Sequence, residues 1–357
     1  SWRADPQGIP LLDVPFYLAQ GEYAGIVDPI VASFTDRQSG EIVAIPEQAA
    51  AVVNKALNLS RLQRLPNADK KVAMLFWNYP PGEKNLSASF MNVPRSFETT
   101  LKAMQAAGYA THGETEDTLI KTLQRLLAPF YRDGELAGLL RDGLAERLPV
   151  ATYRAWLKRQ PPAIQDDIRT RWGDPEKSSM VIIDRGEAVF IIPRLAVGKV
   201  IFSPQAPRGE RWEEKEKALY HSSTAAPSHY YFAHYLWLRE HFKADALIHY
   251  GTHGSQEWLP GKERGLPVTD YPMLAVGDMP VIYPYIVDNI GEALQTKRRG
   301  RAVVISHQTP PFVPAGLHDA LTRIHDLLHQ WLTQDDGAVK EKLAVDLKNQ
   351  VKKERID

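Results

Sequence analysis

The chain has 357 residues, of which 44% are hydrophobic and 24% charged, as is ordinary for a soluble globular protein. Its 43 basic and 43 acidic side chains cancel, so no global field attracts nucleic acid or an anionic membrane. The absence of cysteine excludes disulfides, thiolate metal sites and cysteine nucleophiles. No window approaches the roughly 18 apolar residues that span a bilayer, and no signal-peptide pattern is present. We therefore expect a cytoplasmic protein without a membrane span.

The first part of the chain resembles the end of a domain. Short apolar stretches alternate with turn signals and lead into a helical run from Pro46 to Leu59. The chain begins with Ser1-Trp2-Arg3 rather than Met. We interpret residues 1–66 as the end of a preceding α/β domain and expect the chain to be an internal piece of a longer protein.

A second domain is predicted over residues 67–199, an α/β domain with a helical insertion. The continuous apolar stretch Lys71 to Trp77 predicts a strand, and Arg95 to Ala107 has the spacing of a helix that ends at Gly108. Three further helices are predicted at about 115–131, 134–147 and 151–170, and two short paired strands at 181–184 and 188–192.

A third domain is predicted over residues 200–332, again α/β, followed by a charged helical tail at 333–357. Its predicted elements are strands at 200–203, 244–250, 280–285 and 302–306, and helices at 228–242, 291–297 and 317–332. The alternation of strands and helices predicts the fold class: α/β, multi-domain, with mostly parallel sheets flanked by helices.

Ionisable residues gather directly after the predicted strand 244–250, in "HYGTHGSQEWLPGKERGL". In open α/β sheets, ligands bind beyond the carboxyl ends of strands. Two histidines and a carboxylate, His249, His253 and Glu257, are spaced four and four among glycines, which is a plausible ligand set for a divalent metal or a proton-accepting cluster. Each residue alone also has a purely structural interpretation. His249 would end a strand, His253 would lie in a turn, and Glu257 would complement the dipole at a helix end.

Other polar residues near this segment have either a structural role or a role in ligand binding. His234 and His241 lie one heptad apart on a helix face with Trp237, which favours a core or boundary role, whereas His221 and His229 flank a proline-containing loop. Arginine pairs well with carboxylates. The basic candidates for an acidic ligand are Arg208 and the run Lys297, Arg298, Arg299 and Arg301, although a solvated helix end explains most of that run. The chain has no GxxxxGK[ST] loop, so we do not expect it to hydrolyse ATP.

Several segments in order resemble the CobN family, the large subunit of aerobic cobaltochelatase, which is related to the porphyrin-binding subunit of magnesium chelatase. They are "DPQGIPLLDVPFYLAQGEYAGIVDPIVAS", "NVPRSFETTLKAMQAAGY", "SPQAPRGE", "PSHYYFAHYLWLREHFKADALIH", "HYGTHGSQEWLPGKERGL", "YPYIVDNIGEALQTKRRG" and "ISHQTPP". Trp258-Leu259 stands where magnesium-type relatives usually carry Phe-Met, which favours the cobalt branch. Gln256 replaces the usual Leu, and Glu263-Arg264 the typical Ala-Val.

The resemblance implies ATP-dependent insertion of Co²⁺ into a corrin-type tetrapyrrole, hydrogenobyrinic acid a,c-diamide. ATP and Mg²⁺ would be used by two partner subunits, an AAA+ ATPase and its companion, and the piece alone is expected to be inactive. The alternatives are a magnesium-chelatase-like porphyrin subunit, a CobN-like paralogue, and a non-catalytic scaffold that binds tetrapyrrole or metal.

Roles for single residues follow from this resemblance. His249, His253 and Glu257 would ligate the incoming metal transiently and accept protons. The residues that would contact the tetrapyrrole are Arg208, His221, His229, Trp258, Lys262, Arg298 and Arg299. Among these, the cationic side chains would orient acidic groups of the substrate, and Trp258 is either a stacking surface or core filler.

Overall fold

The structure, a computed structural model, describes residues 2, 5–36, 38–88, 91–211, 222–251, 254–285, 290–306, 319–354 and 356. It comprises two compact units, Ser1–Gln308 and Thr309–Asp357.

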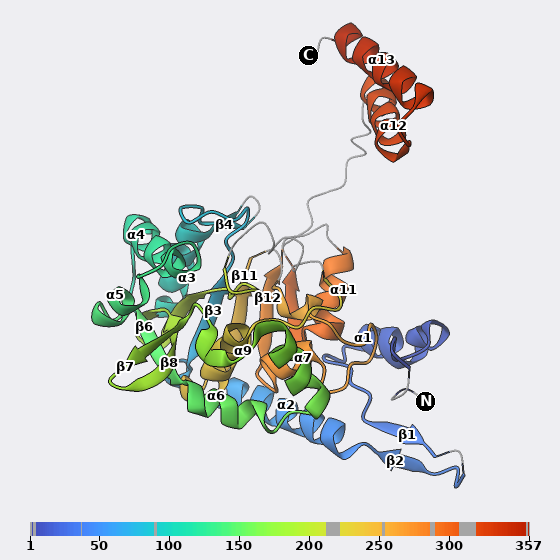
Figure 1. Cartoon of the computed structure of the whole chain (residues 1–357). Coiled ribbons are helices and arrows are strands. Elements are labelled where there is room, and N and C mark those ends of the chain that lie inside the picture. Colours follow the sequence, from blue (N-terminus) through green and yellow to red (C-terminus); the bar gives the residue numbers. More distant parts are fainter. Residues whose placement is uncertain are drawn as a thin grey trace. The chain divides into compact units, whose positions relative to one another are not determined.

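A six-stranded, mostly parallel sheet forms the centre of the first unit (Figure 1). Its strands, in spatial order, are β13 (Ala302–Ser306), β12 (Val281–Tyr285), β11 (Ala246–Tyr250), β3 (Val72–Phe76), β10 (Val200–Pro204) and β9 (Leu195–Val197). Only β9 runs antiparallel to its neighbour within this sheet. The prediction of an α/β fold with a mostly parallel sheet is confirmed.

The order of the parallel strands identifies a doubly wound topology. Along the chain β3 comes first and β10 second, but β10 lies on one side of β3 and β11, β12 and β13 follow on the other. The chain therefore reverses its winding direction beside β3. All five residues of β3 and of β10 are buried, as expected for parallel strands that helices cover on both faces.

One face of the sheet is covered by α3 (Val93–Ala106) and α4 (Glu116–Leu127). Phe97 of α3 is fully buried and packs on three aromatic rings of this face, Phe202, Tyr250 and Phe76, at centroid distances of 4.1, 4.8 and 6.1 Å. Asn92 caps α3 by accepting a hydrogen bond from the Arg95 amide. Side chains of the intervening strand positions point to the opposite face.

The opposite face is covered by α9 (His229–Leu236), which continues as the π-helical turn η6 (Trp237–His241). Every residue of α9 is buried, and Ser228 caps it by accepting a hydrogen bond from the Tyr231 amide. The remaining elements near this face are η7 (Gln256–Trp258), α10 (Tyr271–Val276) and α11 (Ile290–Arg299).

A separate antiparallel sheet lies beside the first, in the order β6 (Ala145–Pro149), β8 (Glu187–Pro193) and β7 (Val181–Asp184). The predicted strand pair around Arg185-Gly186 is confirmed, and both turn residues have positive φ angles. The other elements of this region are η4 (Ala128–Phe130), α5 (Leu136–Arg141), α6 (Val150–Leu157), α7 (Pro162–Trp172) and η5 (Pro175–Lys177).

The predicted helix at 134–147 is wrong in its second half. The chain is helical only from Leu136 to Arg141, turns at Gly143, and then enters β6. β6 pairs with residues of β8 that lie 40 to 48 positions further along the chain, and this pairing overrides the local helical spacing.

The N-terminal segment lies against the sheet's amino edge. Its long helix is α2 (Pro46–Arg64), and it also contains η1 (Leu11–Asp13), η2 (Pro15–Ala19), α1 (Gln20–Tyr23), β1 (Ser33–Thr35), β2 (Ile42–Ala44) and η3 (Asn67–Asp69). Lys55 Nζ of α2 donates to the carbonyls of Met279, at 2.5 Å, and Arg301, at 2.9 Å, which precede β12 and β13. Arg61 Nε binds Asp245, directly before β11, at 3.0 Å. This helix therefore joins three adjacent strands at their starts.

The observed organisation differs from the predicted four-part division. β3 comes from the predicted domain 67–199, yet it lies between β10 and β11 of the predicted domain 200–332. Hydrophobic periodicity identifies strands but does not record which strands pair. The remaining short strands, β4 (Ser87–Ala88) and β5 (Met91–Asn92), form a two-stranded ladder in the loop after β3.

In the second unit, the described residues include two helices, α12 (Asp319–Thr333) and α13 (Ala338–Lys353), which pack against each other. No side chain of α13 is buried. This helix falls within the segment predicted as a charged helical tail.

Candidate functional site

The candidate site lies at the carboxyl edge of the six-stranded sheet, where β11 ends (Figure 1). The connection after β3 covers one face of the sheet and the connection after β11 the other, so the switch point of the topology lies between these two strands. The two connections come close together there, because a Cβ on Gly251 would lie 3.1 Å from Cδ1 of Trp77. The predicted cluster therefore lies at the position where this fold favours ligand binding.

His249 is enclosed at this edge and contacts two tyrosine rings. It is 2% exposed. The ring of Tyr283, on β12, stacks on it with centroids 4.8 Å apart and planes 15° apart, and Tyr235 of α9 lies at 6.2 Å. β11 and β12 run parallel, and Leu247 pairs with Val281. Because side chains alternate between faces, the residues two positions further along share one face.

Glu257 lies in η7 and is completely buried. Its Oε1 accepts a hydrogen bond from the Gly254 amide at 3.0 Å, and its Oε2 accepts one from the Tyr283 hydroxyl at 2.8 Å. Burial, followed by the charge of Glu257, raises the pKa of the Tyr283 phenol well above its usual value. The phenol therefore stays protonated and donates to the carboxylate, while its ring supports the imidazole of His249.

A glycine is required where this turn passes the histidine. A Cβ on Gly254 would lie 2.4 Å from Oη of Tyr283 and 2.6 Å from Nδ1 of His249. Both distances are far shorter than van der Waals contact. The glycine at 254 therefore allows the turn backbone to approach these two side chains closely.

Two tyrosines of α9 connect the helix to the site. The Tyr231 hydroxyl and the Ser255 hydroxyl are 2.7 Å apart, and the Tyr235 hydroxyl donates to Oε1 of Gln205, after β10, at 3.2 Å. Tyr231, Tyr235 and Tyr283 are not among the site residues predicted from the sequence. A recognisable signal was present, because tyrosine hydroxyls on buried elements require polar partners.

Two arginines that were predicted to bind substrate donate hydrogen bonds to backbone carbonyls of the protein. Arg208 is almost fully buried and donates to the carbonyls of Ser222, at 3.1 Å, and Ser255, at 3.4 Å. Arg299 is also buried, and its three guanidinium nitrogens donate to the carbonyls of Glu257, at 2.7 Å, Leu259, at 2.6 Å, and Lys262. Arg299 therefore holds the backbone that carries Glu257, and direct substrate contact by either arginine stays a prediction.

Arg298 and Lys262 contact the N-terminal segment. Arg298 forms a two-pronged ion pair with Glu22, at 3.0 and 2.9 Å. Lys262 Nζ donates to the Asp5 carbonyl and lies 5.9 Å from the Trp2 ring centroid. These contacts join residues more than 250 positions apart in the chain. The predicted role of Arg298 and Lys262 in orienting a substrate is not tested by them.

His229 and His234 form hydrogen bonds with residues other than His249, Tyr283 and Glu257. The carbonyl of Gly173 accepts a hydrogen bond from Nε2 of His229 at 2.9 Å, so Nδ1 accepts from the Tyr153 hydroxyl, also at 2.9 Å. Burial lowers the pKa of His229. His234 is fully buried, where desolvation lowers its pKa to about 3, whereas His241 is exposed. Trp258 is half-buried.

The predicted metal set is only partly described. His249 and Glu257 share Tyr283 as a common neighbour, but His253 and also His221 lie outside the described residues. Within the part of the chain that the structure describes, no three His, Asp or Glu side chains are grouped to hold a metal ion. The described part of the site therefore contains three groups: the neutral phenol of Tyr283, the carboxylate of Glu257 and the imidazole of His249. Carboxylate and imidazole groups can accept a proton.

A doubly wound, mostly parallel sheet defines the class of fold as α/β. In this class ligands usually bind at the carboxyl edge of the sheet, where His249 and Glu257 lie. The chain belongs to the CobN/Magnesium Chelatase family, whose match covers residues 1–357. This confirms the family to which the sequence segments pointed.

Individual relatives give the same result. The chain is 31% identical to "Aerobic cobaltochelatase subunit CobN" of Sinorhizobium sp and 29% identical to a magnesium-chelatase subunit of Rhodobacter capsulatus, with 94% and 92% of this chain covered. The solved "Catalytic Subunit of Cobaltochelatase from Mycobacterium tuberculosis" is 29% identical over 100% of this chain, with a TM-score of 0.75. The chain spans 26%, 28% and 30% of the lengths of these three proteins.

Among the described residues, no helix is both long enough and apolar enough to cross a membrane.

Proposed function

We propose that the chain is a segment of the tetrapyrrole-binding subunit of a chelatase that inserts Co²⁺ into hydrogenobyrinic acid a,c-diamide. The observation that carries the proposal is the buried array of His249, Tyr283 and Glu257 at the switch point of a chain from this family. Relatives with cobalt and with magnesium in their names are about equally similar to it. The choice of cobalt rests on two segments that differ from magnesium-type relatives, Trp258-Leu259 and Tyr283-Pro-Tyr-Ile-Val287.

Metal insertion makes three demands on a protein: water must leave the cation, two ring N–H protons must leave the macrocycle, and the ring must be held. Glu257 is an acceptor for a departing proton, because its carboxylate is removed from water. The imidazole of His249 is a ligand for a partly dehydrated cation during transfer. Tyr283 contacts both groups, because its ring stacks on His249 and its hydroxyl donates to Glu257.

ATP hydrolysis is assigned in this proposal to two partner subunits, an AAA+ ATPase and a companion subunit, which would use Mg²⁺. The absence of a GxxxxGK[ST] loop from the chain supports this division. Co²⁺ would be a substrate of the reaction and not a resident cofactor.

The direct test is a metal-insertion assay with the full-length protein, its partner subunits and ATP. Co²⁺ and Mg²⁺ are each offered with the corrin substrate and with a porphyrin, and product formation is followed by absorbance. We expect insertion of Co²⁺ into the corrin only. Faster insertion of Mg²⁺ into the porphyrin would assign the protein to the magnesium branch and would contradict the cobalt proposal.

A second candidate function is a scaffold that binds tetrapyrrole or metal while other residues complete the reaction. The observation that favours it is enclosure, since Glu257 is 0% and His249 2% exposed. Titration of this chain with the tetrapyrrole, followed by absorbance, tests for binding. Binding that persists when the full assembly with ATP fails to insert any metal would favour the scaffold.

A further inference from the structure

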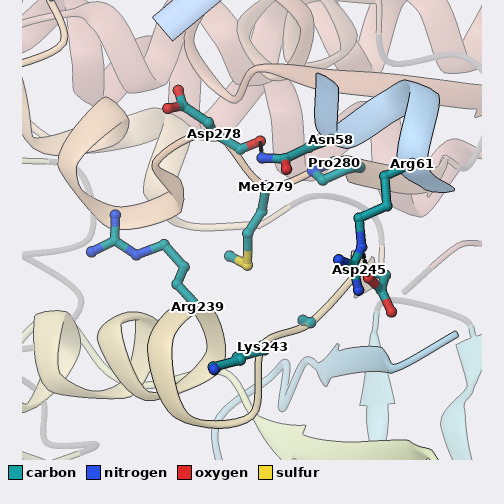
Figure 2. A pocket seen from close by; sticks show the side chains of 9 residues that line it. Asn58, Arg61, Arg239, Lys243, Asp245, Asp278, Met279 and Pro280 are labelled. Carbon is teal, nitrogen blue, oxygen red and sulfur yellow. Dashed lines mark hydrogen bonds and ion pairs between the residues drawn. The ribbon is translucent and has the colours of Figure 1, made fainter. Parts of the chain in front are cut away.

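A small pocket lies at the amino edge of the six-stranded sheet, at the opposite ends of the strands from the candidate site (Figure 2). Its volume is about 290 Å³. It lies among α2, the end of η6 and the residues that precede β11 and β12. Its lining residues are Asn58, Arg61, Arg239, Lys243, Ala244, Asp245, Asp278, Met279 and Pro280.

The two carboxylates of this pocket are already engaged. Asp245 accepts hydrogen bonds from Arg61 Nε at 3.0 Å and from the Lys71 amide at 2.9 Å. Asp278 accepts hydrogen bonds from Arg301 Nη1 at 2.5 Å and from Asn54 Nδ2 at 3.2 Å. The hydrogen bonds of both carboxylates therefore come from donors other than Arg239 and Lys243, the remaining two cations of the pocket.

Those remaining cations are Arg239 and Lys243. Among the described residues, neither has a carboxylate oxygen within 4.0 Å, and Nε of Arg239 is buried without a hydrogen-bond partner. In Figure 2 Arg239 lies on one side of Met279, with its guanidinium directed away from Arg61 and Asp245, which lie on the other side. The charges of Glu240 and Asp278 act on this guanidinium, but its buried Nε has no acceptor. A buried donor without an acceptor is unfavourable, so an anion that accepts from it would be stabilised there.

The local backbone also accommodates this arginine. Gly277 has a φ of +55°, and a Cβ at that position would lie 2.5 Å from Nη1 of Arg239. The glycine therefore leaves room for the guanidinium beside the turn that precedes β12. Burial lowers the pKa of Arg239 below its ordinary value, but a guanidinium remains charged near neutral pH.

We propose that this pocket binds a small phosphate-type oxyanion, held by Arg239 and Lys243. A guanidinium presents paired N–H donors that match the oxygens of phosphate, and an ammonium adds a point charge. The volume is at the lower end of the range of about 300–1,000 Å³ for drug-sized ligands, so the occupant is a free phosphate or the phosphate group of a small ester. The site is separate from the proposed metal-insertion site and does not depend on it.

Calorimetric titration of the whole chain with inorganic phosphate tests this, with chloride at matched ionic strength as reference. We expect saturable binding of phosphate only, and at least tenfold weaker binding in Arg239→Met, a change of about 1.4 kcal/mol in binding free energy. Thermal unfolding gives a second readout, because phosphate should raise the midpoint of the wild type more than that of the variant.

Arg169→Met is the matched control, since Arg169 is an exposed arginine paired with Asp166; it should bind phosphate like the wild type. If Arg239→Met does not fold, Lys243→Met decides, because Lys243 is exposed and its removal should also weaken binding. Absence of saturable phosphate binding to the wild type, or wild-type binding in the Arg239 variant or in the Lys243 variant, overturns the proposal. Titration with a small phosphate ester such as glycerol phosphate distinguishes the free ion from a phosphate group, by which of the two binds more tightly. None of these readouts depends on chelatase activity.

Discussion

Gly254 determines how closely the turn after β11 packs on the stacked rings of His249 and Tyr283. Its amide also donates to Glu257, so this residue contacts all three members of the buried array. A methyl group there has no space, because the nearest atoms belong to buried side chains whose rings are stacked.

Gly254→Ala should therefore destabilise the fold by about 1–3 kcal/mol, the usual effect of overpacking a core. The measurement is the free energy of unfolding in urea. Gly291→Ala is the control, because a Cβ on this α11 residue meets no atom within 4 Å. The control should be unchanged or stabilised by up to about 1 kcal/mol. Equal stability of Gly254→Ala and the wild type would show that the turn does not pack as described.

The sequence predicted the positions of His249 and Glu257 at a strand end, but not the use of the basic residues near them. Arg298 binds Glu22, a residue 276 positions earlier in the chain, and Arg299 binds backbone carbonyls. Such partners depend on the tertiary fold, and no local pattern encodes them. Tyr283 was missed for a similar reason, because the residues that it contacts, among them His249 and Glu257, belong to different elements.

At the scale of elements, α2 is joined to the sheet by a buried lysine and a buried arginine. Arg301 forms ion pairs with Asp28, at 2.8 Å, and Asp278, at 2.5 Å, and its carbonyl accepts from Lys55 Nζ at 2.9 Å. Burial lowers the pKa of Lys55 from 10.5 to about 8, with the neighbouring charges of Asp28, Arg301 and Asp278 as smaller effects. A pKa shift of one unit corresponds to about 1.4 kcal/mol, so the shift of Lys55 corresponds to about 3 kcal/mol in the free energy of unfolding.

The sign of the resulting pH dependence follows from proton binding. Between about pH 8 and 10.5 the unfolded chain holds the Lys55 proton while the folded chain has released it, so stability rises with pH across this window. The free energy of unfolding of the wild type, relative to Lys55→Met, should thus increase by up to about 3 kcal/mol from below pH 8 to near pH 10.5. Urea unfolding at both ends of the window measures it. The exposed residue Lys121 is the control, and Lys121→Met should retain the wild-type pH dependence. Parallel pH profiles for the wild type and Lys55→Met would contradict a buried, charged lysine.

Elements were predicted best where local spacing and tertiary packing agree. The strands at 302–306 and 281–285 and the helix at 93–106 lie close to their predicted bounds. The stretch 145–149 has residues that also fit a helix, and only its pairing with β8 makes it a strand. Edge elements of this kind depend on partners that are remote in the sequence.

At the scale of the whole molecule, the fold class followed from the alternation of elements, whereas the strand order did not. The position of β3 between β10 and β11 creates the switch point, and about 120 residues of insertion separate β3 from β10 in the chain. Four segments that come after β10, β11, β12 and β13 in the chain lie outside the described residues: 212–221, 252–253, 286–289 and 307–318. The buried array is therefore the part of the proposed site that the structure defines.

The central claim is that Glu257 accepts a proton during metal insertion, and the Glu257→Gln variant tests it most directly. In the full-length protein with its partners and ATP, the rate of Co²⁺ insertion should fall by about 10²–10⁴-fold, the usual contribution of a general base. Tetrapyrrole affinity, measured by absorbance titration, should be unchanged, because glutamine preserves the shape of the side chain. Glu263→Gln, at an exposed glutamate bound to Arg264, is the control and should keep wild-type rates. Insertion at the wild-type rate by Glu257→Gln would contradict the account.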